Sequence, residues 1–180
     1  MADELVLAGW ALVRPVSTPR ALGRSLPRQV ISISDCIQDD LPLPQWWDWT
    51  QDRALLEEAR RADAPDARIV AIALEEEEAS RFMAAHGRDE PCFDLLRQGC
   101  PIDGTALGFE VVGTELDVDF HSWLCYHLAD DALAALGIEV NGVGLLDSAD
   151  RARQVREWML GLPMQEAPPE IPWTYVGLLL

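Results

Sequence analysis

Short apolar segments, each about the length of one β-strand, are the feature that most constrains the fold of this chain. Five of them are separated by polar or helix-like stretches: 4–13 (ELVLAGWALV), 30–37 (VISISDCI), 67–74 (ARIVAIAL), 107–119 (LGFEVVGTELDVD) and 173–180 (WTYVGLLL). The alternation in 30–37 predicts a strand with one strongly apolar face. No apolar run approaches the roughly 18 residues that a membrane-spanning helix needs.

Helical patterns fill much of the chain between these segments, at 50–62, 75–87, 91–99, 120–137 and 148–161. Thr50 and Ser148 are expected N-caps, and glycines follow three of the helices. Because strands and helices do not alternate strictly, the sequence predicts an α+β fold with one mixed or largely antiparallel sheet and about five helices. We expect a single domain over 1–180, with an N-terminal strand and arm at 1–28 and a proline-rich connector and closing strand at 162–180.

The charge of the chain is strongly negative and unevenly placed. The net charge is −17, and all 14 basic residues are arginines. Between Arg97 and Arg151 there are ten acidic residues and no basic residue, so this span carries −10 of the total. Such a field repels nucleic acid and anionic membranes and attracts a basic partner, although general solubility would also account for it. Asp3 and Glu4 stand where a secretory signal carries basic residues, so we expect a cytoplasmic protein.

The segment 120–128 (FHSWLCYHL) concentrates residues that can carry chemistry. On a helix, Cys125 would join the core-facing stripe and act as a small buried hydrophobe. His121 lies one turn earlier, so a His121–Cys125 nucleophile pair is an alternative. His127 would face another side, which leaves too few ligands for a metal. The four cysteines contain no CxxC, and we expect all of them to be reduced thiols.

A pair of carboxylates, Asp117 and Asp119, would lie on one face of an extended segment. Such a pair could hold Mg²⁺, but no lysine or arginine is close in sequence to bind a phosphate substrate. We therefore favour an acidic edge that faces solvent or a partner. The chain has no P-loop, GxSxG or GxGxxG pattern, and no cofactor or metal is expected.

The loop 38–50 (QDDLPLPQWWDWT) combines prolines, acids and three tryptophans. Tryptophan among acids is typical of a hot spot for a basic partner. The alternatives are a loop that folds back over the core and an aromatic platform for a sugar. Together with the acidic edge, the predicted partner-binding residues are Asp39, Asp40, Trp46, Trp47, Asp48, Trp49, Glu115, Asp117 and Asp119.

Several segments together resemble a family of small bacterial proteins with a GFEV…FHSWxC block. The resemblance covers roughly residues 30–160 and includes VISISDC, GFEVVGTE, FHSWLC and GLLDSADRARQV. Its most specific element is Phe120-His121-Ser122-Trp123 with Cys125. The resemblance implies no enzymatic activity. In size and acidity the chain is similar to immunity proteins, which neutralise a toxin by binding it.

The function we expect from the sequence is therefore non-enzymatic. The chain would bind and mask a basic protein partner such as a bacterial toxin domain, without contacting nucleic acid or membrane. The alternative is a hydrolase-type enzyme that uses His121 with Cys125, or the Asp117/Asp119 pair. A regulatory adaptor that mimics DNA is a third possibility. The oligomeric state stays open.

Overall fold

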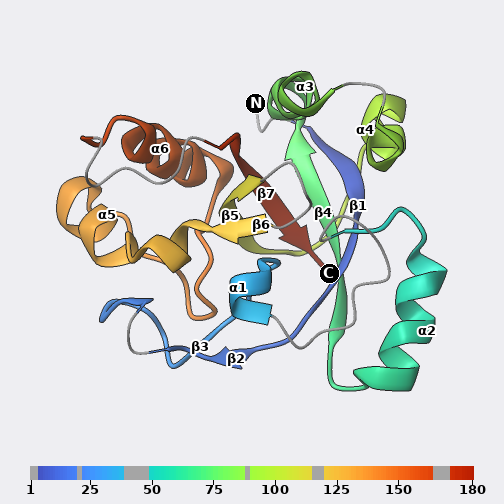
Figure 1. The fold of residues 1–180 in the computed structure, drawn as a ribbon, viewed down its shortest axis with the longest axis horizontal. Coiled ribbons are helices and arrows are strands. Elements are labelled where there is room, and N and C mark those ends of the chain that lie inside the picture. Colours follow the sequence, from blue (N-terminus) through green and yellow to red (C-terminus); the bar gives the residue numbers. More distant parts are fainter. Residues whose placement is uncertain (1–3, 20–21, 39–48, 88–89, 115–119, 164–170) are drawn as a thin grey trace.

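The computed structural model describes most of the chain as one α+β unit (Figure 1). The described residues are 4–19, 22–38, 49–87, 90–114, 120–163 and 171–180. The strands are β1 (Leu5–Val13), β2 (Val16–Ser17), β3 (Gln29–Val30), β4 (Arg68–Glu75), β5 (Ala106–Thr114), β6 (Phe120–Ser122) and β7 (Trp173–Leu179). The α-helices are α1 (Asp35–Gln38), α2 (Arg53–Asp63), α3 (Glu76–His86), α4 (Asp94–Gln98), α5 (Ala129–Leu136) and α6 (Ala149–Leu160). Two 3-10 helices are η2 (Pro91–Phe93) and η3 (Trp123–Tyr126).

The main sheet has five described strands in the order β1-β4-β7-β5-β6, and each neighbouring pair is antiparallel. The predicted α+β class with a largely antiparallel sheet is thereby confirmed. The closing segment forms β7 at the centre of the sheet, where all seven residues are buried. Burial on both faces explains why this strand is apolar nearly throughout.

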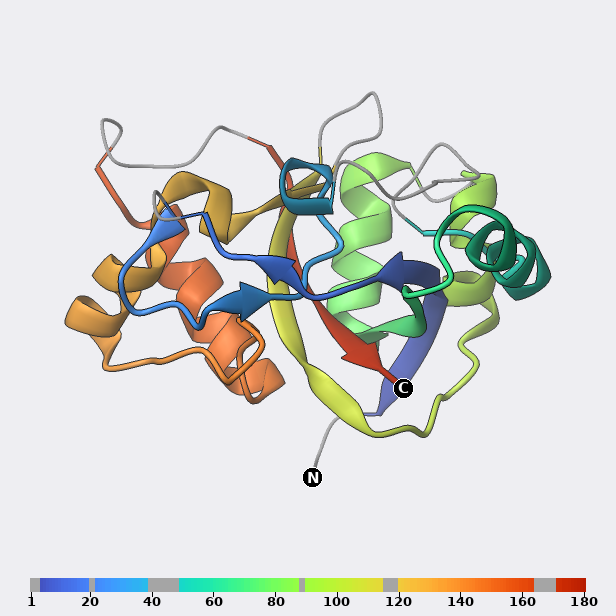
Figure 2. The same ribbon diagram turned by 90° about the horizontal axis from the view of Figure 1, so that it is seen from below.

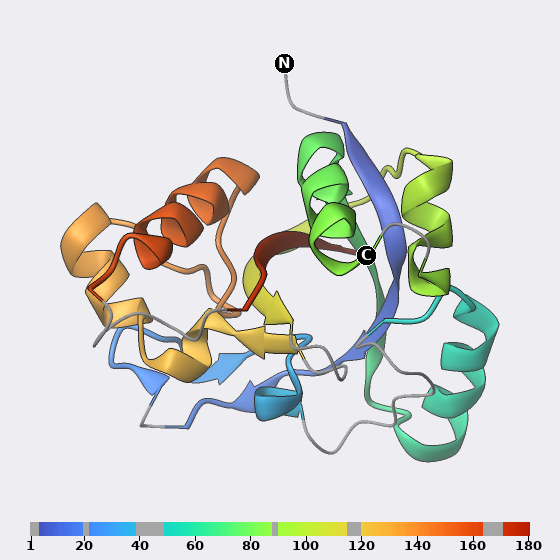
Figure 3. The same ribbon diagram turned by 45° about the horizontal axis from the view of Figure 1, so that its top comes forward.

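The helices lie in two groups on either side of the central strands. Figures 1, 2 and 3 place α5 and α6 together at the left of the view and α3, α4 and α2 toward its right, and in Figure 3 α3 lies between α6 and β1. One hydrophobic cluster joins α3 and α4 to β1 and β4, and a second joins α5 and α6 to β5. β7 contributes to both clusters, with Val176 and Leu178 in the first and Trp173 and Tyr175 in the second.

The pairing of β4 with β7 is short and leaves part of the two strands without backbone pairing. It covers three residue pairs, from Ala71–Leu179 to Ala73–Gly177. Beyond Gly177 the two strands are joined by side chains instead of backbone hydrogen bonds, beginning with Tyr175 and Glu75. The helices α3 and α6 approach each other over this opening (Figure 3).

The predicted helix 120–137 is wrong in its first half. Phe120–Ser122 forms β6, which pairs with Val112 to Thr114 of β5. The Ser122 hydroxyl then accepts from the Leu124 backbone N–H and begins η3, and His127 ends η3 with φ 61°. Pairing with an existing strand stabilises an extended backbone that the helical spacing alone could not reveal.

The predicted strand 30–37 is also wrong in most of its length. Only Gln29–Val30 is a strand, and Asp35–Gln38 forms α1. Ser32 and Ser34 are both fully buried, and their polar atoms are hydrogen bonded. Local side-chain hydrogen bonds of this kind compete with the strand that the alternation favours.

The prediction that all cysteines are reduced is contradicted by a disulfide between Cys36 and Cys125. These residues lie in α1 and η3 and are 89 residues apart in sequence. The fold brings the two segments together because α1 packs beside β6. Cys92 and Cys100 remain free.

Candidate functional site

Most of the predicted partner-binding residues fall outside the described part of the chain. These are Asp39, Asp40, Trp46, Trp47, Asp48, Glu115, Asp117 and Asp119. Their role therefore stays a prediction.

Trp49 is the one predicted partner-binding residue whose surroundings are described, and it is a core residue. Its side chain is 2% exposed, and its ring lies 5.8 Å from that of Phe82 and 5.2 Å from that of Phe120. Gly9 makes room for it, since a Cβ there would lie 2.9 Å from Trp49 Cδ1. Trp49 therefore does not belong to an exposed surface. Residues 39–48 of the same loop lie outside the described residues, so the alternative that the loop folds back over the core stays a prediction.

The His121–Cys125 pair is not a one-turn helical pair. His121 lies in β6, whereas Cys125 lies in η3 and is bonded to Cys36. A sulfur held in a disulfide is not a nucleophilic thiolate. In the described part of the chain, no group of three or more histidine, cysteine or acidic side chains is arranged to hold a metal ion.

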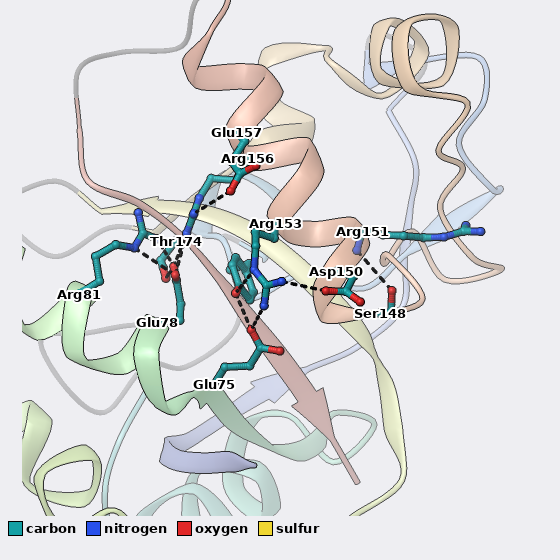
Figure 4. A network of polar contacts seen from close by, with 11 residues as sticks. Glu75, Glu78, Arg81, Ser148, Asp150, Arg151, Arg153, Arg156, Glu157 and Thr174 are labelled. Atoms are coloured by element: carbon teal, nitrogen blue, oxygen red, sulfur yellow. Dashed lines mark hydrogen bonds and ion pairs between the residues drawn. The ribbon is translucent and has the colours of Figure 1, made fainter. Parts of the chain in front are cut away.

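In the described part of the chain, a polar cleft between α3 and α6 combines buried charged residues with an open volume. Its volume is about 500 Å³. Among the described residues, its lining holds six carboxylates, three guanidinium groups and one phenol: Glu4, Glu75, Glu76, Glu77, Glu78, Glu157, Arg81, Arg153, Arg156 and Tyr175. Figure 4 shows Arg153 and Arg156 of α6 reaching toward Glu75 and Glu78.

Glu78 is the centre of the first half of this network. It is 4% exposed, and its carboxylate accepts two hydrogen bonds from Arg156 Nη1, at 2.8 and 2.7 Å. Thr174 Oγ1 donates to it at 2.5 Å, and Arg81 donates through Nε at 3.0 Å. Burial alone would raise the pKa of Glu78, but the hydrogen bonds from Arg81, Thr174 and Arg156 outweigh it and hold the pKa below its usual value. Glu78 is therefore a buried, fully paired anion.

Glu75 is the centre of the second half. It is 7% exposed and accepts from Tyr175 Oη at 2.6 Å and from Arg153 Nη2 at 2.5 Å. Burial, followed by the bond to Glu75, raises the pKa of Tyr175, so the phenol stays protonated and acts as a donor. The guanidinium carbons of Arg153 and Arg156 lie 5.9 and 5.2 Å from the centre of the Tyr175 ring. Both arginines are thus held by an anion and an aromatic face together.

The outer part of the cleft is anionic. Glu4, Glu76 and Glu77 are exposed, and the side chain of Glu157 is 63% exposed. Six carboxylates against three guanidinium groups leave the described lining with a net charge of −3. Walls of low dielectric concentrate such a field, which favours a cationic group at the opening.

The run of four glutamates at 75–78 shows what the sequence analysis missed. A charged first turn of a helix is normally solvated, and this holds for Glu76 and Glu77. Glu75 and Glu78 are buried instead, and Arg153 and Arg156 of α6 repeat the same three-residue spacing. Matching i, i+3 pairs of opposite charge on two helical segments were the available signal.

A second polar site surrounds Glu110 of β5, which is 1% exposed. Ser32 Oγ donates to its Oε1 at 2.5 Å, and the Ile33 backbone N–H donates to its Oε2 at 3.0 Å. Burial raises the pKa of Glu110 above its usual value, although hydrogen bonds from Ser32, Ile33 and Ser122 oppose this. Unlike the outer carboxylates of the cleft, Glu110 is buried.

No helix in the described part of the chain is both long and apolar enough to cross a membrane. Comparisons of the chain with protein-family models, with curated proteins and with solved structures find no match.

Proposed function

We propose that this chain is a non-enzymatic acidic protein that binds and masks a basic protein partner, as an immunity protein does with a bacterial toxin domain. The observation that carries the proposal is the cleft between α3 and α6, with its net charge of −3. The net charge of the whole chain, −17, also favours a cationic partner. A field of this sign speeds the encounter with a cationic surface.

The cleft suits an arginine or lysine side chain of the partner. Its inner carboxylates, Glu75 and Glu78, are already paired with arginines of the chain itself. The outer ones, Glu76, Glu77 and Glu157, face solvent and can pair with an incoming cation at little desolvation cost. The inner network would then act as a rigid floor, and the outer carboxylates would make the contact.

The hydrolase alternative receives less support. The disulfide removes the Cys125 thiolate that a nucleophilic mechanism needs. The Asp117/Asp119 pair lies outside the described residues.

The test is capture of partner proteins from native cell lysate on the immobilised chain, at low and at high salt, with bound proteins identified by mass. We expect one basic protein to be retained at low salt and to dissociate at high salt, because exposed ion pairs are screened. Retention of no basic protein at either salt concentration would contradict the proposal.

A matched pair of variants locates the contact. Glu76→Gln with Glu77→Gln removes two charges from the cleft, and Glu58→Gln with Asp63→Asn removes two exposed charges from α2. Each rim charge contributes about 0.5–1 kcal/mol, so the loss of two charges should weaken binding of the purified partner roughly five- to thirtyfold. Equal weakening by both variants would show that only the overall charge matters.

A further inference from the structure

The disulfide between Cys36 and Cys125 is unequally exposed at its two ends. Cys36 lies in α1 and is exposed, whereas Cys125 lies in η3 and is half-buried. Their Cα atoms are 6.9 Å apart. An attacking thiolate must reach one sulfur along the line of the S–S bond, and Cys36 is the end that solvent can approach.

The hydroxyl group of Ser34 lies beside the sulfur of Cys36. Ser34 Oγ is 2.7 Å from Cys36 Sγ and 4.0 Å from Cys125 Sγ. A disulfide sulfur carries no hydrogen, so Ser34 is the donor. The same hydroxyl can donate to a thiolate on Cys36 when the bond opens, and hydrogen bonds to anionic acceptors are stronger than those to neutral ones.

Hydrogen bonds to Glu110 hold the segment that carries Ser34 in place. The Ser34 backbone N–H donates to Ser32 Oγ at 2.9 Å, and Ser32 Oγ donates to Glu110 Oε1 at 2.5 Å. The Ile33 N–H donates to the second oxygen of the same carboxyl group at 3.0 Å. Ser32 and Ser34 are fully buried and Glu110 nearly so. None of these contacts depends on the disulfide, so the chain up to Ser34 keeps its place when the bond is open.

We propose that the Cys36–Cys125 disulfide is a reversible thiol–disulfide exchange site that takes a dithiol reductant at Cys36, and that Glu110 is the positioning residue that returns Cys36 to Cys125 on reclosure. The inference goes beyond the proposed binding function and does not depend on it.

The thiol–disulfide exchange takes place in two steps. One thiolate of the dithiol attacks Cys36 Sγ, which forms a mixed disulfide, breaks the bond to Cys125 and releases the Cys125 thiolate, which takes a proton from solvent. The second thiolate of the reductant then attacks the other sulfur of the reductant, which is bonded to Cys36 in the mixed disulfide. This expels the Cys36 thiolate next to Ser34. The Cys36 thiolate takes a proton from solvent, as Cys125 did. The reductant leaves as a cyclic disulfide, and two electrons have passed to the protein.

The first experiment follows the four cysteines of the folded chain in mixtures of reduced and oxidised dithiothreitol. Open thiols are alkylated with iodoacetamide and located by peptide mass spectrometry. Cys100 is exposed and free and serves as the internal standard. Cys92 is half-buried, and burial raises its pKa to about 12, so it should label slowly. We expect Cys36 and Cys125 to become labelled together as the buffer becomes more reducing, while the circular dichroism of the fold is retained.

Two outcomes would overturn the exchange site. Cys36 and Cys125 could stay unlabelled in excess dithiothreitol until the protein unfolds, which would make the disulfide purely structural. They could also be labelled fully in oxidised buffer, which would mean that the bond does not form in solution.

Single-cysteine variants test which sulfur is attacked. In a Cys100→Ser background, Cys125→Ser leaves the Cys36 thiol and Cys36→Ser leaves the Cys125 thiol, with Cys92 common to both. Reaction with 5,5′-dithiobis(2-nitrobenzoate) should be faster for Cys36, because this residue is exposed and its sulfur lies beside the Ser34 hydroxyl. An equal or faster rate at Cys125 would refute the assignment.

Glu110→Gln tests the positioning role. The amide has one acceptor oxygen in place of two, so one hydrogen bond of the 32–34 segment is lost, which should slow reclosure about fivefold. The rate of reclosure measured as a function of pH is a second test, because an inflection caused by titration of Glu110 should be absent from the variant. Ser25→Ala, at an exposed site away from the disulfide, is the control. Unchanged reclosure and an unchanged pH profile in Glu110→Gln would rule out positioning by Glu110.

Discussion

Glu78 and Glu110 are buried to nearly the same extent in the same protein, yet their surroundings are opposite. Glu78 is 4% exposed and Glu110 is 1% exposed. Glu78 accepts from two arginines and a threonine, whereas the donors to Glu110 among the described residues are hydroxyl and backbone N–H groups. The pKa of Glu78 is lowered and that of Glu110 is raised.

The difference shows that burial by itself does not decide the charge of a carboxyl group. A guanidinium group at hydrogen-bonding distance compensates for the lost hydration of an anion, and neutral donors do so only in part. The two glutamates also hold different parts of the fold. Glu78 fastens α6 to α3 over the opening between β4 and β7, and Glu110 fastens the segment before α1 to β5.

The largest expected effect follows from Glu78→Gln. Among the described residues, this change leaves buried Arg156 with only its 3.9 Å ion pair to the exposed Glu157, and we expect it to lower the free energy of unfolding by about 3–5 kcal/mol. Urea denaturation followed by circular dichroism measures it. Glu76→Gln, at an exposed position of the same helix, is the control and should shift stability by less than about 0.5 kcal/mol. A loss below about 1 kcal/mol for Glu78→Gln would show that the pair is not effectively buried.

Tyr175→Phe is expected to have the next largest effect. It removes the 2.6 Å hydrogen bond to the buried Glu75 and keeps the ring beside the guanidinium groups of Arg153 and Arg156. Hydrogen bonds to charged groups contribute about 1.5–3 kcal/mol, so a loss of about 2 kcal/mol should be seen by the same denaturation assay. A neutral result would mean that Arg153 satisfies Glu75 without help.

Glu110→Gln should have the smallest effect on stability, and the size of that effect should depend on pH. The raised pKa means that the folded state holds this proton more tightly than the unfolded state does. The contribution of Glu110 to stability is therefore complete below the ordinary value of 4.5 and decreases as the pH rises from 4.5 toward the raised pKa. At pH 4 the variant should be less stable than the wild type by about 1 kcal/mol, and the gap should narrow as the pH rises.

Glu78 should give the opposite pH dependence in the same experiment. Its lowered pKa contributes stability that is present above 4.5 and is lost as the pH falls through the lowered pKa. Stability curves of the wild type, Glu78→Gln and Glu110→Gln between pH 3 and pH 8 therefore separate the two sites. Parallel differences for both variants would mean that the two carboxyl groups share one environment after all.

Local patterns in the sequence were sufficient for most of the elements and for the α+β class. The apolar segments at 67–74 and 173–180 became β4 and β7, and the helix after Ser148 became α6 with that serine as its cap. These features depend on interactions over a few residues, which the sequence contains directly. The negative charge is likewise a property of the composition.

What only the tertiary structure decided are contacts between residues far apart in the chain. Cys36 and Cys125 are 89 residues apart, Glu78 and Arg156 are 78 apart, and Tyr175 and Glu75 are 100 apart. No periodicity encodes which of the four cysteines will meet, and the i, i+3 spacing of Glu75 and Glu78 indicates a pairing only once α6 is known to lie opposite α3. These outcomes follow from the antiparallel sheet, in which the last strand of the chain lies between β4 and β5 and draws α3 and α6 together. The sequence by itself thus determined the elements and the sign of the charge, and the packing of the sheet determined where charge and sulfur are held.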